Sequence, residues 1–213
     1  MTSGRFITFE GGEGAGKSTQ LTLLAEALTA AGFEVVTTRE PGGSKGAEAI
    51  RALLVTGDTD RWDAETEALL HTAARRDHLA RTVWPALQRG AWVICDRFAD
   101  STLAYQGYGH GLSKDFIRDL TRLAIGEFKP DLTLILDLPV EEGLRRAGGR
   151  GGAEDRYERM GTAFHERLRQ GFLDIARADP DRCAVVDATL PLDEVRQAVL
   201  RAVKSRLLGF CVP

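Results

Sequence analysis

A glycine-rich segment near the start of the chain carries the residue types that bind phosphate. Residues 11–18 read GGEGAGKS and match the phosphate-loop (P-loop) pattern GxxxxGK[ST]. Glycines let backbone N–H groups approach phosphate oxygens, while a solvent-facing Lys17 would bridge the outer phosphates of a nucleoside triphosphate. The Ser18 hydroxyl is expected to bind Mg²⁺. The residues predicted to surround the triphosphate are Gly11, Gly12, Glu13, Gly14, Ala15, Gly16, Lys17, Ser18 and Thr19.

An aspartate at the end of an apolar run is the expected second ligand of Mg²⁺. Residues 92–96 read WVICD, so Asp96 lies at the carboxyl end of a predicted strand, where ligands gather in open α/β sheets. Asp137 ends a similar run and is the competing candidate. We favour Asp96 because Arg97 follows it and places a cation where phosphates must meet.

Short apolar runs alternate along the chain with longer segments of helical period. Strand-like runs cover residues 5–10, 34–38, 92–96, 132–137 and 183–187. A long amphipathic helix is predicted over 64–88, Ser113 caps a helix over 114–126, and further helices begin near Lys17, Glu141 and Tyr157. Strands that are apolar on both faces, such as TLILDL, are typical of parallel sheets covered by helices. We therefore predict an α/β protein with a five-stranded parallel sheet flanked by helices.

The overall composition excludes several classes of protein. With 213 residues, 43% of them hydrophobic, we expect one domain over 1–213. A formal net charge of −3 argues against a general nucleic-acid binder. No basic leader precedes the first strand and no apolar window reaches bilayer length, so we expect a cytoplasmic protein without a membrane partner. Three cysteines without a CxxC pair argue against a disulfide scaffold or a zinc site.

A glycine- and arginine-containing segment interrupts the regular pattern late in the chain. Residues 147–153 read AGGRGGA, and residues 145–159 hold five arginines against three acids. Beside a phosphate site, this composition favours a mobile lid over about 147–156. A solvated charged loop is the alternative interpretation.

The P-loop alone leaves the reaction open, but other residues narrow the choice. The chain has no Asn-Lys-x-Asp motif for reading guanine, and Asp-Arg stands where motor and helicase ATPases usually have Asp-Glu. A small-molecule kinase is the leading class. A deoxynucleoside or shikimate-type kinase is one alternative, and a nucleotide-binding switch or assembly ATPase is another.

Motifs along nearly the whole chain resemble the thymidylate kinase family. They are FEGGEGAGKST, TREPGG (38–43), DRFADSTLAYQG (96–107), PDLTLILDLP (130–139) and DRYE (155–158). The resemblance implies a P-loop kinase fold, transfer of the γ-phosphoryl group of ATP to dTMP to give dTDP, and use of Mg²⁺ with ATP. It also implies a homodimer, the usual state in this family.

The same resemblance implies roles for residues of an acceptor pocket. Arg97 would bind the dTMP phosphate, and Glu13 would face the sugar 3′-OH or the neighbouring acceptor site. Tyr105 would crowd the 2′ position, and Arg75 would donate to thymine O4. An ordinary half-buried tyrosine is the alternative for Tyr105, and a surface ion pair with Asp77 or Glu67 is the alternative for Arg75. The remaining pocket residues would be Glu40, Pro41, His71, Ser101, Thr102 and Gln106.

Two positions mark this chain within the family. His71 stands where members usually carry the phenylalanine on which thymine stacks. The P-loop lacks an extra basic residue, and in such members the lid supplies the catalytic arginine, which here would be Arg150. Arg145, Arg146 and Arg156 are further candidate partners for adenine or phosphate.

Overall fold

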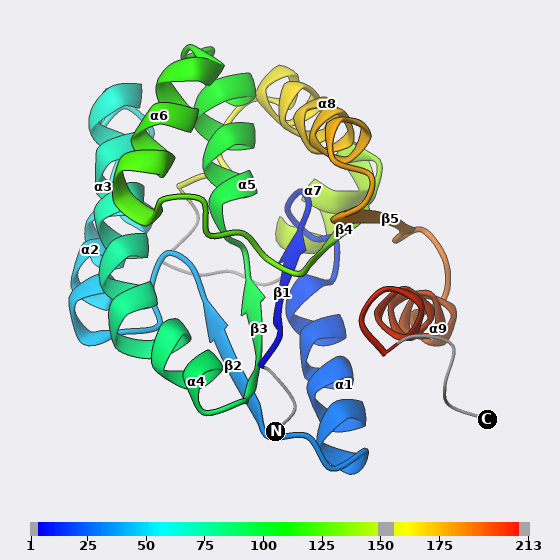
Figure 1. Ribbon diagram of the computed structural model, residues 1–213. Helices are drawn as coiled ribbons and strands as arrows, with labels where there is room; N and C mark the ends of the chain where they lie inside the picture. The colour runs from blue at the N-terminus through cyan, green and yellow to red at the C-terminus, as the bar shows by residue number, and fades with distance from the viewer. Residues whose placement is uncertain (1–3, 149–155, 209–213) are drawn as a thin grey trace.

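The computed structural model describes residues 4–148 and 156–208. Its centre is a parallel sheet with strand order β2-β3-β1-β4-β5 (Figure 1). The strands are β1 (Phe6–Glu10), β2 (Val35–Arg39), β3 (Trp92–Asp96), β4 (Leu132–Asp137) and β5 (Cys183–Asp187). The predicted five-stranded parallel sheet is therefore confirmed, and each strand lies within one residue of its predicted run.

Helices and π-helical turns lie between the strands and after β5. They are α1 (Lys17–Ala30), α2 (Lys45–Val55), α3 (Ala64–His78), η1 (Leu79–Val83), α4 (Trp84–Gln88), α5 (Ala99–Thr102), η2 (Leu103–Gly109), α6 (Lys114–Ile125), α7 (Val140–Gly148), α8 (Thr162–Ala178), α9 (Leu192–Val203) and η3 (Lys204–Leu208).

Helices cover both faces of the sheet (Figure 1), and apolar clusters attach them to it. On one face, Leu24 of α1 and Val199 of α9 pack with Phe9 of β1. On the other face, η1 and α4 pack with α6 against β1 and β3. A third cluster joins α8 to η2 and β4. Every residue of β1 and all but the last residue of β4 are buried, as expected for strands covered by helices on both faces.

The helix predictions were mostly confirmed. The segment 64–88 is helical throughout, as α3, η1 and α4 in succession, and Ser113 Oγ accepts a bond from Phe116 N–H at the start of α6. The predicted helix start near Tyr157 is wrong, because α8 begins at Thr162. Residues 156–159 form a turn, and Gly161 before the helix is extended at φ −65° and ψ 157°.

The described helices are all short or polar by the standard of membrane spans. Within residues 4–148 and 156–208, none has both the length and the apolar composition that crossing a bilayer requires.

Candidate active site

The P-loop occupies the connection between β1 and α1, as predicted. Gly11 has φ +128°, and a Cβ there would lie 2.3 Å from the carbonyl oxygen of Leu136. Gly14 has φ +68°, and its Cβ would lie 2.1 Å from the carbonyl oxygen of Gly143. Only glycine fits these two positions, because the loop packs directly on the backbone of β4 and α7.

Lys17 lies at the first position of α1 and turns back over the loop. Its Nζ donates to the carbonyl oxygens of Gly12 at 2.7 Å and Gly11 at 3.1 Å. The side chain is only 7% exposed, so the prediction of a solvent-facing lysine is wrong. Burial, with a further contribution from Arg97, lowers the pKa of Lys17 to about 8. The loop carbonyls provide the polar partners that a buried ammonium needs.

The two predicted Mg²⁺ ligands meet at the edge of the loop. Ser18 Oγ donates to Asp96 Oδ2 at 2.7 Å, and the parallel pairing of Phe9 with Asp96 brings the ends of β1 and β3 together. The competing carboxylate of Asp137 instead accepts two bonds from Arg169, at 2.7 and 2.9 Å. Asp96 is therefore the aspartate placed beside Ser18.

Arg97 lies in a left-handed backbone conformation, with φ 71°, directly after β3. Its N–H donates to the carbonyl oxygen of Phe9 at 2.9 Å. Its guanidinium donates to Glu13 Oε1 at 3.0 Å, Gly11 O at 3.1 Å and Ser101 Oγ at 3.2 Å. A conformation that is costly for a side-chain-bearing residue persists because its neighbours hold it, and such positions concentrate at functional sites.

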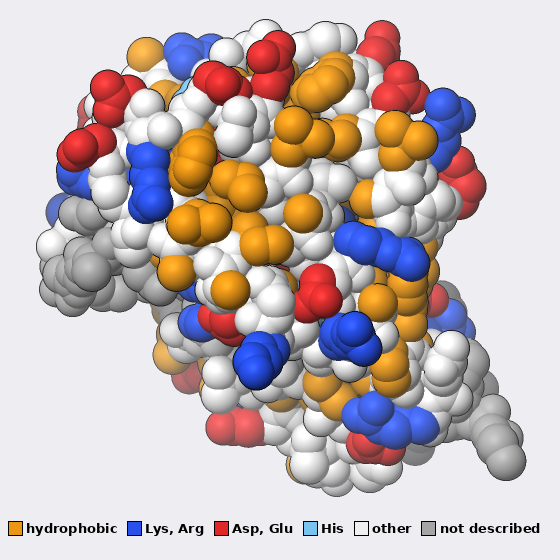
Figure 2. Space-filling view, turned by 90° about the vertical axis from the view of Figure 1, so that its left-hand side faces the viewer, with side chains coloured by type: hydrophobic (Ala, Val, Ile, Leu, Met, Phe, Trp, Pro, Cys, Tyr) orange, Lys and Arg blue, Asp and Glu red, His pale blue; other side chains and the backbone are white. Residues whose placement is uncertain are grey.

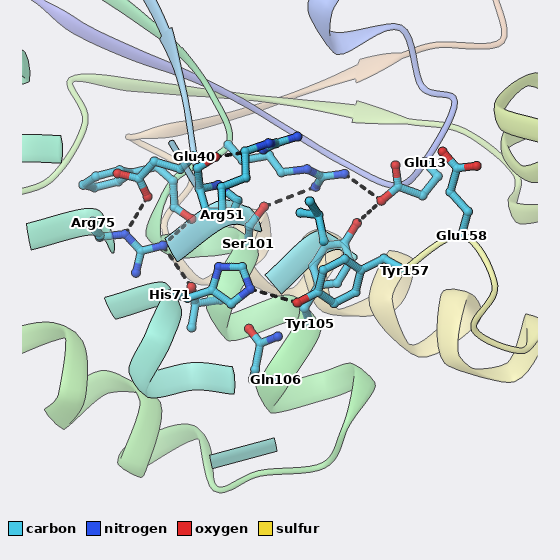
Figure 3. Close-up of a pocket in the computed structure, with 15 residues that line it drawn as sticks. Glu13, Glu40, Arg51, His71, Arg75, Ser101, Tyr105, Gln106, Tyr157 and Glu158 are labelled. Atoms are coloured by element: carbon cyan, nitrogen blue, oxygen red, sulfur yellow. Dashed lines mark hydrogen bonds and ion pairs between the residues drawn. The ribbon is translucent and has the colours of Figure 1, made fainter. Parts of the chain in front are cut away.

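Glu13 connects the P-loop to the neighbouring pocket (Figure 3). It accepts bonds from Arg97 and from the Tyr105 hydroxyl, the latter at 2.5 Å. Burial alone would raise the pKa of Glu13, but Arg97 and Lys17 lower it to about 2. The carboxylate is therefore ionised at neutral pH.

A cavity opens beside the P-loop and is bounded by several elements (Figure 3). Its wall includes all the residues predicted for the acceptor pocket: Glu13, Glu40, Pro41, His71, Arg75, Arg97, Ser101, Thr102, Tyr105 and Gln106. It also includes residues outside the predicted pocket: Arg51, Val55, Phe98, Tyr157 and Glu158.

Arg75 enters this cavity wall from α3 and is only 2% exposed. Its Nε donates to Glu40 Oε2 at 2.8 Å, and its Nη2 donates to Thr102 Oγ1 at 2.9 Å and to the carbonyl oxygen of Phe98 at 3.1 Å (Figure 3). Its Nη1 is buried without a hydrogen-bond partner among the described residues. The arginine therefore has one donor group left for a ligand.

The alternative of a surface ion pair for Arg75 is wrong. Asp77 lies near Arg81 and accepts a bond from Ser44, while Glu67 pairs with Arg156.

Gln106 has the complementary deficit. It is fully buried, and its Nε2 donates to Glu67 Oε1 at 2.7 Å. Because a carboxylate can only accept, this bond fixes the orientation of the amide and leaves Gln106 Oε1 as an acceptor. That oxygen has no partner within the described part of the chain. The cavity wall thus holds one unsatisfied donor and one unsatisfied acceptor.

His71 lines the cavity and bonds across it to the turn before α8. Its Nε2 lies 2.9 Å from the Tyr157 hydroxyl (Figure 3). The Tyr157 ring in turn meets the Tyr105 ring edge-on, with centroids 5.2 Å apart. Burial lowers the pKa of His71 to about 4, so the imidazole is neutral at pH 7.

Arg51 is a cavity residue that the sequence could have indicated. It shares a helix face with the buried Ala47, Leu54 and Val55, and its Nη1 donates to the carbonyl oxygen of Pro41 at 2.8 Å. An arginine on the apolar face of a helix is a signal for a buried or ligand-facing cation.

Arg156 has a structural role, so its assignment as a nucleotide ligand is wrong. It is fully buried and pairs with the carboxylate of Glu67. Its guanidinium also donates to the carbonyl oxygens of Asp58, Thr59 and Leu54 at 2.9, 2.9 and 3.2 Å. These bonds attach the turn before α8 to the connection between α2 and α3.

The remaining predicted arginines lie near or beyond the end of α7. Arg145 and Arg146 both pair with Glu142 at 2.7 Å. Arg150 and most of the predicted lid lie outside the described residues, so that prediction stays untested.

Known proteins match this chain over nearly its whole length. A family model described as Thymidylate kinase matches residues 9–199. The thymidylate kinase of Caulobacter vibrioides is 60% identical over 207 residues, which are 97% of this chain and 99% of that protein. That of Ruegeria pomeroyi is 54% identical over 205 residues, covering 96% of this chain and 97% of that protein.

A solved structure agrees with the sequence relatives. The crystal structure of thymidylate kinase from Ehrlichia chaffeensis matches with a TM-score of 0.75 and 38% identity, covering 94% of this chain and 99% of that chain. The likeness extends far beyond the P-loop, through the acceptor cavity and the helices that build it. This chain therefore belongs to the thymidylate kinase family.

Proposed function

We propose that this chain transfers the γ-phosphoryl group of ATP to dTMP, giving dTDP and ADP. The observation that carries the proposal is the pair of unsatisfied atoms in the cavity beside the P-loop, the Arg75 Nη1 donor and the Gln106 Oε1 acceptor. Buried polar groups are rarely left unpaired, so these two atoms favour a ligand edge that presents both an acceptor and a donor.

Thymine has that edge. Its O4 accepts and its N3–H donates, which matches Arg75 and Gln106 respectively. Cytosine presents the reverse pattern, an N3 acceptor beside an amine donor. Because guanidinium has no acceptor, Arg75 cannot receive that amine. Uracil has the same edge as thymine, so discrimination between these two bases must come from packing around the 5-methyl group.

The acceptor phosphate is assigned to the cations near the P-loop. Arg97 lies between the cavity and the loop, and Arg51 of the cavity wall is a further guanidinium for the phosphate. Glu13 faces the sugar 3′-OH, and Tyr105 crowds the 2′ position, in keeping with its bond to Glu13. A monophosphate is already largely ionised at neutral pH, so the reaction needs positioning and charge neutralisation rather than a general base.

ATP is assigned to residues 11–19, with Mg²⁺ held by Ser18 and Asp96. The two side chains supply hard oxygen ligands in direct contact with each other, and Mg²⁺ usually completes such a pair with phosphate oxygens and water. The ion would neutralise charge on the phosphates. Lys17 Nζ donates to loop carbonyl oxygens. With ATP bound, phosphate oxygens would accept these hydrogen bonds instead of the carbonyls.

A homodimer is proposed through the side of the molecule formed by α2, α3 and α6. Figure 2 shows hydrophobic side chains gathered on this side. Leu69 of α3 is 52% exposed, Leu123 of α6 is 85% exposed, and Leu53 and Phe116 are also exposed. A second copy would cover this apolar surface. Light scattering should report a dimer, and Leu69→Glu with Leu123→Glu should convert it to a monomer.

A coupled assay of ADP release tests the proposed reaction. The enzyme is given ATP and Mg²⁺ with dTMP, dUMP, dCMP, dAMP or dGMP in turn. We expect the highest kcat/KM with dTMP and near-background rates with dCMP and the purine nucleotides. ADP release that does not depend on any monophosphate would instead favour a switch or assembly ATPase.

A further inference from the structure

Glu10 is a buried ionisable residue to which the proposed reaction gives no role. It is the last residue of β1, directly before the P-loop, and its side chain is fully buried. Burial, together with the nearby Asp100, raises the pKa of Glu10 to about 8. Burying a carboxyl group is unfavourable unless it is well hydrogen-bonded, so its partners indicate why it is there.

Both partners of Glu10 belong to the segment that follows Arg97. Glu10 Oε1 accepts from the Phe98 N–H at 2.8 Å, and Glu10 Oε2 bonds to the Ser101 hydroxyl at 2.5 Å. Phe98 precedes the first turn of α5, whose own N-terminal groups have no intrahelical partner. Glu10 therefore holds the start of α5 against the end of β1.

The same segment holds the guanidinium of Arg97. Ser101 Oγ, which bonds to Glu10, also accepts from Arg97 Nη1 at 3.2 Å. Arg97 Nη1 further donates to Gly11 O, and the Arg97 N–H donates to Phe9 O. Three consecutive residues thus bind this region. Phe9 binds the backbone N–H of Arg97, Glu10 binds the N–H of the next residue, Phe98, and Gly11 binds the side chain of Arg97.

We infer that Glu10 is a positioning residue, which holds Arg97 in register with the P-loop through Ser101 and the Phe98 N–H. The inference rests on the proposed function, in which Arg97 binds the acceptor phosphate. Phosphoryl transfer requires donor and acceptor phosphates in line, and small displacements are costly. A chain of bonds from the strand that leads into the P-loop to the acceptor-binding arginine sets that alignment.

The proposed link depends on hydrogen bonds and not on the charge of Glu10. The Ser101 hydroxyl can donate to a carboxylate or accept from a carboxylic acid, and in both cases it still accepts from Arg97. A glutamine at position 10 can do the same, since its amide accepts from the Phe98 N–H and donates to Ser101. Methionine fills a similar volume but makes neither bond.

The variants Glu10→Gln, Glu10→Met and Ser101→Ala test the inference, with Glu26→Met on the exposed face of α1 as the matched control. Calorimetry measures binding of dTMP and of thymidine, which lacks the phosphate, and kinetics give kcat and both KM values. For Glu10→Met we expect about tenfold weaker dTMP binding and a lower kcat, with thymidine binding and the KM for ATP within about twofold. Glu10→Gln should retain nearly full activity.

Ser101→Ala should weaken dTMP binding and lower kcat, as Glu10→Met does. The double variant should weaken dTMP binding little more than the larger single change, because both substitutions interrupt the same series of hydrogen bonds. Equal loss of thymidine and dTMP binding in Glu10→Met, or a Glu10→Gln enzyme as impaired as Glu10→Met, would overturn the inference. If Glu10→Met does not fold, thymidine and dTMP binding are compared in Ser101→Ala. Equal loss of both there would likewise overturn the inference. A wild-type enzyme that neither binds nor phosphorylates dTMP would contradict the proposed function instead.

Discussion

The P-loop and the acceptor cavity lie side by side, but they are built in different ways. The P-loop consists of consecutive residues between β1 and α1. We expect it to bind phosphate mainly through backbone N–H groups, and its close packing on the neighbouring backbone depends on glycine at Gly11 and Gly14. The acceptor cavity uses side chains from the P-loop, α2, α3, α5, η2 and the turn before α8. Phosphate binding by backbone groups can therefore be specified by a short sequence motif. Acceptor binding by side chains here depends instead on long-range hydrogen bonds and ion pairs.

Lys17→Ala should produce the largest effect, and it should act on the donor side. Removing the ammonium that would contact the outer phosphates should lower kcat by about 10³-fold or more. Within residues 4–148 and 156–208 its hydrogen bonds go to two carbonyls of the P-loop, so the thermal midpoint should change little. Steady-state kinetics and thermal melts check both, with the exposed Lys204→Ala as control. Full activity in a folded Lys17→Ala enzyme would remove the P-loop assignment.

Arg156→Met should show that the acceptor side depends on bonds between distant segments. The change leaves the buried carboxylate of Glu67 without its arginine partner, and breaking a buried ion pair typically costs about 3–5 kcal/mol of unfolding free energy. Urea unfolding measures the loss. The exposed pair of Arg118 and Asp115 supplies the control, because Arg118→Met should cost less than about 1 kcal/mol. Equal costs for the two variants would contradict the structural role of Arg156.

Arg97→Ala should impair the acceptor side selectively. A charge-assisted contact to the dTMP phosphate both binds and aligns it, so kcat/KM for dTMP should fall by about 10²-fold through both constants. The exposed Arg122→Ala is the control. If only the KM for ATP rises, Arg97 belongs to the donor site and the comparison between the two regions must be redrawn.

His71 offers a smaller and more specific test of the cavity wall. Loss of a ring that packs against thymine typically costs about 1–3 kcal/mol, so His71→Ala should raise the KM for dTMP roughly tenfold and leave the KM for ATP unchanged. His71→Phe should keep or improve the KM for dTMP, because phenyl provides a broader stacking face. An unchanged KM for dTMP in a folded His71→Ala enzyme would exclude stacking.

The smallest predicted effect concerns acid stability. The pKa of His71 is lowered from 6.5 to about 4 by burial, so below pH 6.5 the unfolded chain binds a proton that the folded chain does not. This group therefore lowers stability as the pH falls from 6.5 to 4. His71→Phe should remove that part of the pH dependence. Urea midpoints measured across this range, identical in slope for both proteins, would show that His71 does not contribute.

Sequence reasoning succeeded where the physical signal is local. The strands were predicted because both faces of a buried strand must be apolar, and the P-loop because glycine positions are set by backbone geometry. It failed for Arg156, where a charged residue in an apparently solvated loop is fully buried. Nothing in the local composition distinguishes a buried arginine from a solvated one here, because the acid and the carbonyls that bind Arg156 come from other parts of the chain.

Family resemblance selected the acceptor residues, but their contacts came from the tertiary structure. The sequence favoured Asp96 over Asp137 only through the neighbouring Arg97. The fold gives a direct reason, because Arg169 of α8 binds Asp137 and Ser18 of α1 binds Asp96. Likewise, the sequence could name Arg75, but only the fold shows which of its donors stays unsatisfied.

The α/β class, the strand positions, the P-loop and the resemblance to a kinase family could all be inferred without coordinates. These features depend on hydrophobic period and on residues close together in the chain. The tertiary structure decided that Lys17 is buried, that Gln106 keeps a free acceptor and that Glu10 lies behind Arg97. Such properties arise when segments as distant as residues 10 and 101 meet, because burial and hydrogen-bond satisfaction belong to the packed chain and not to any single segment.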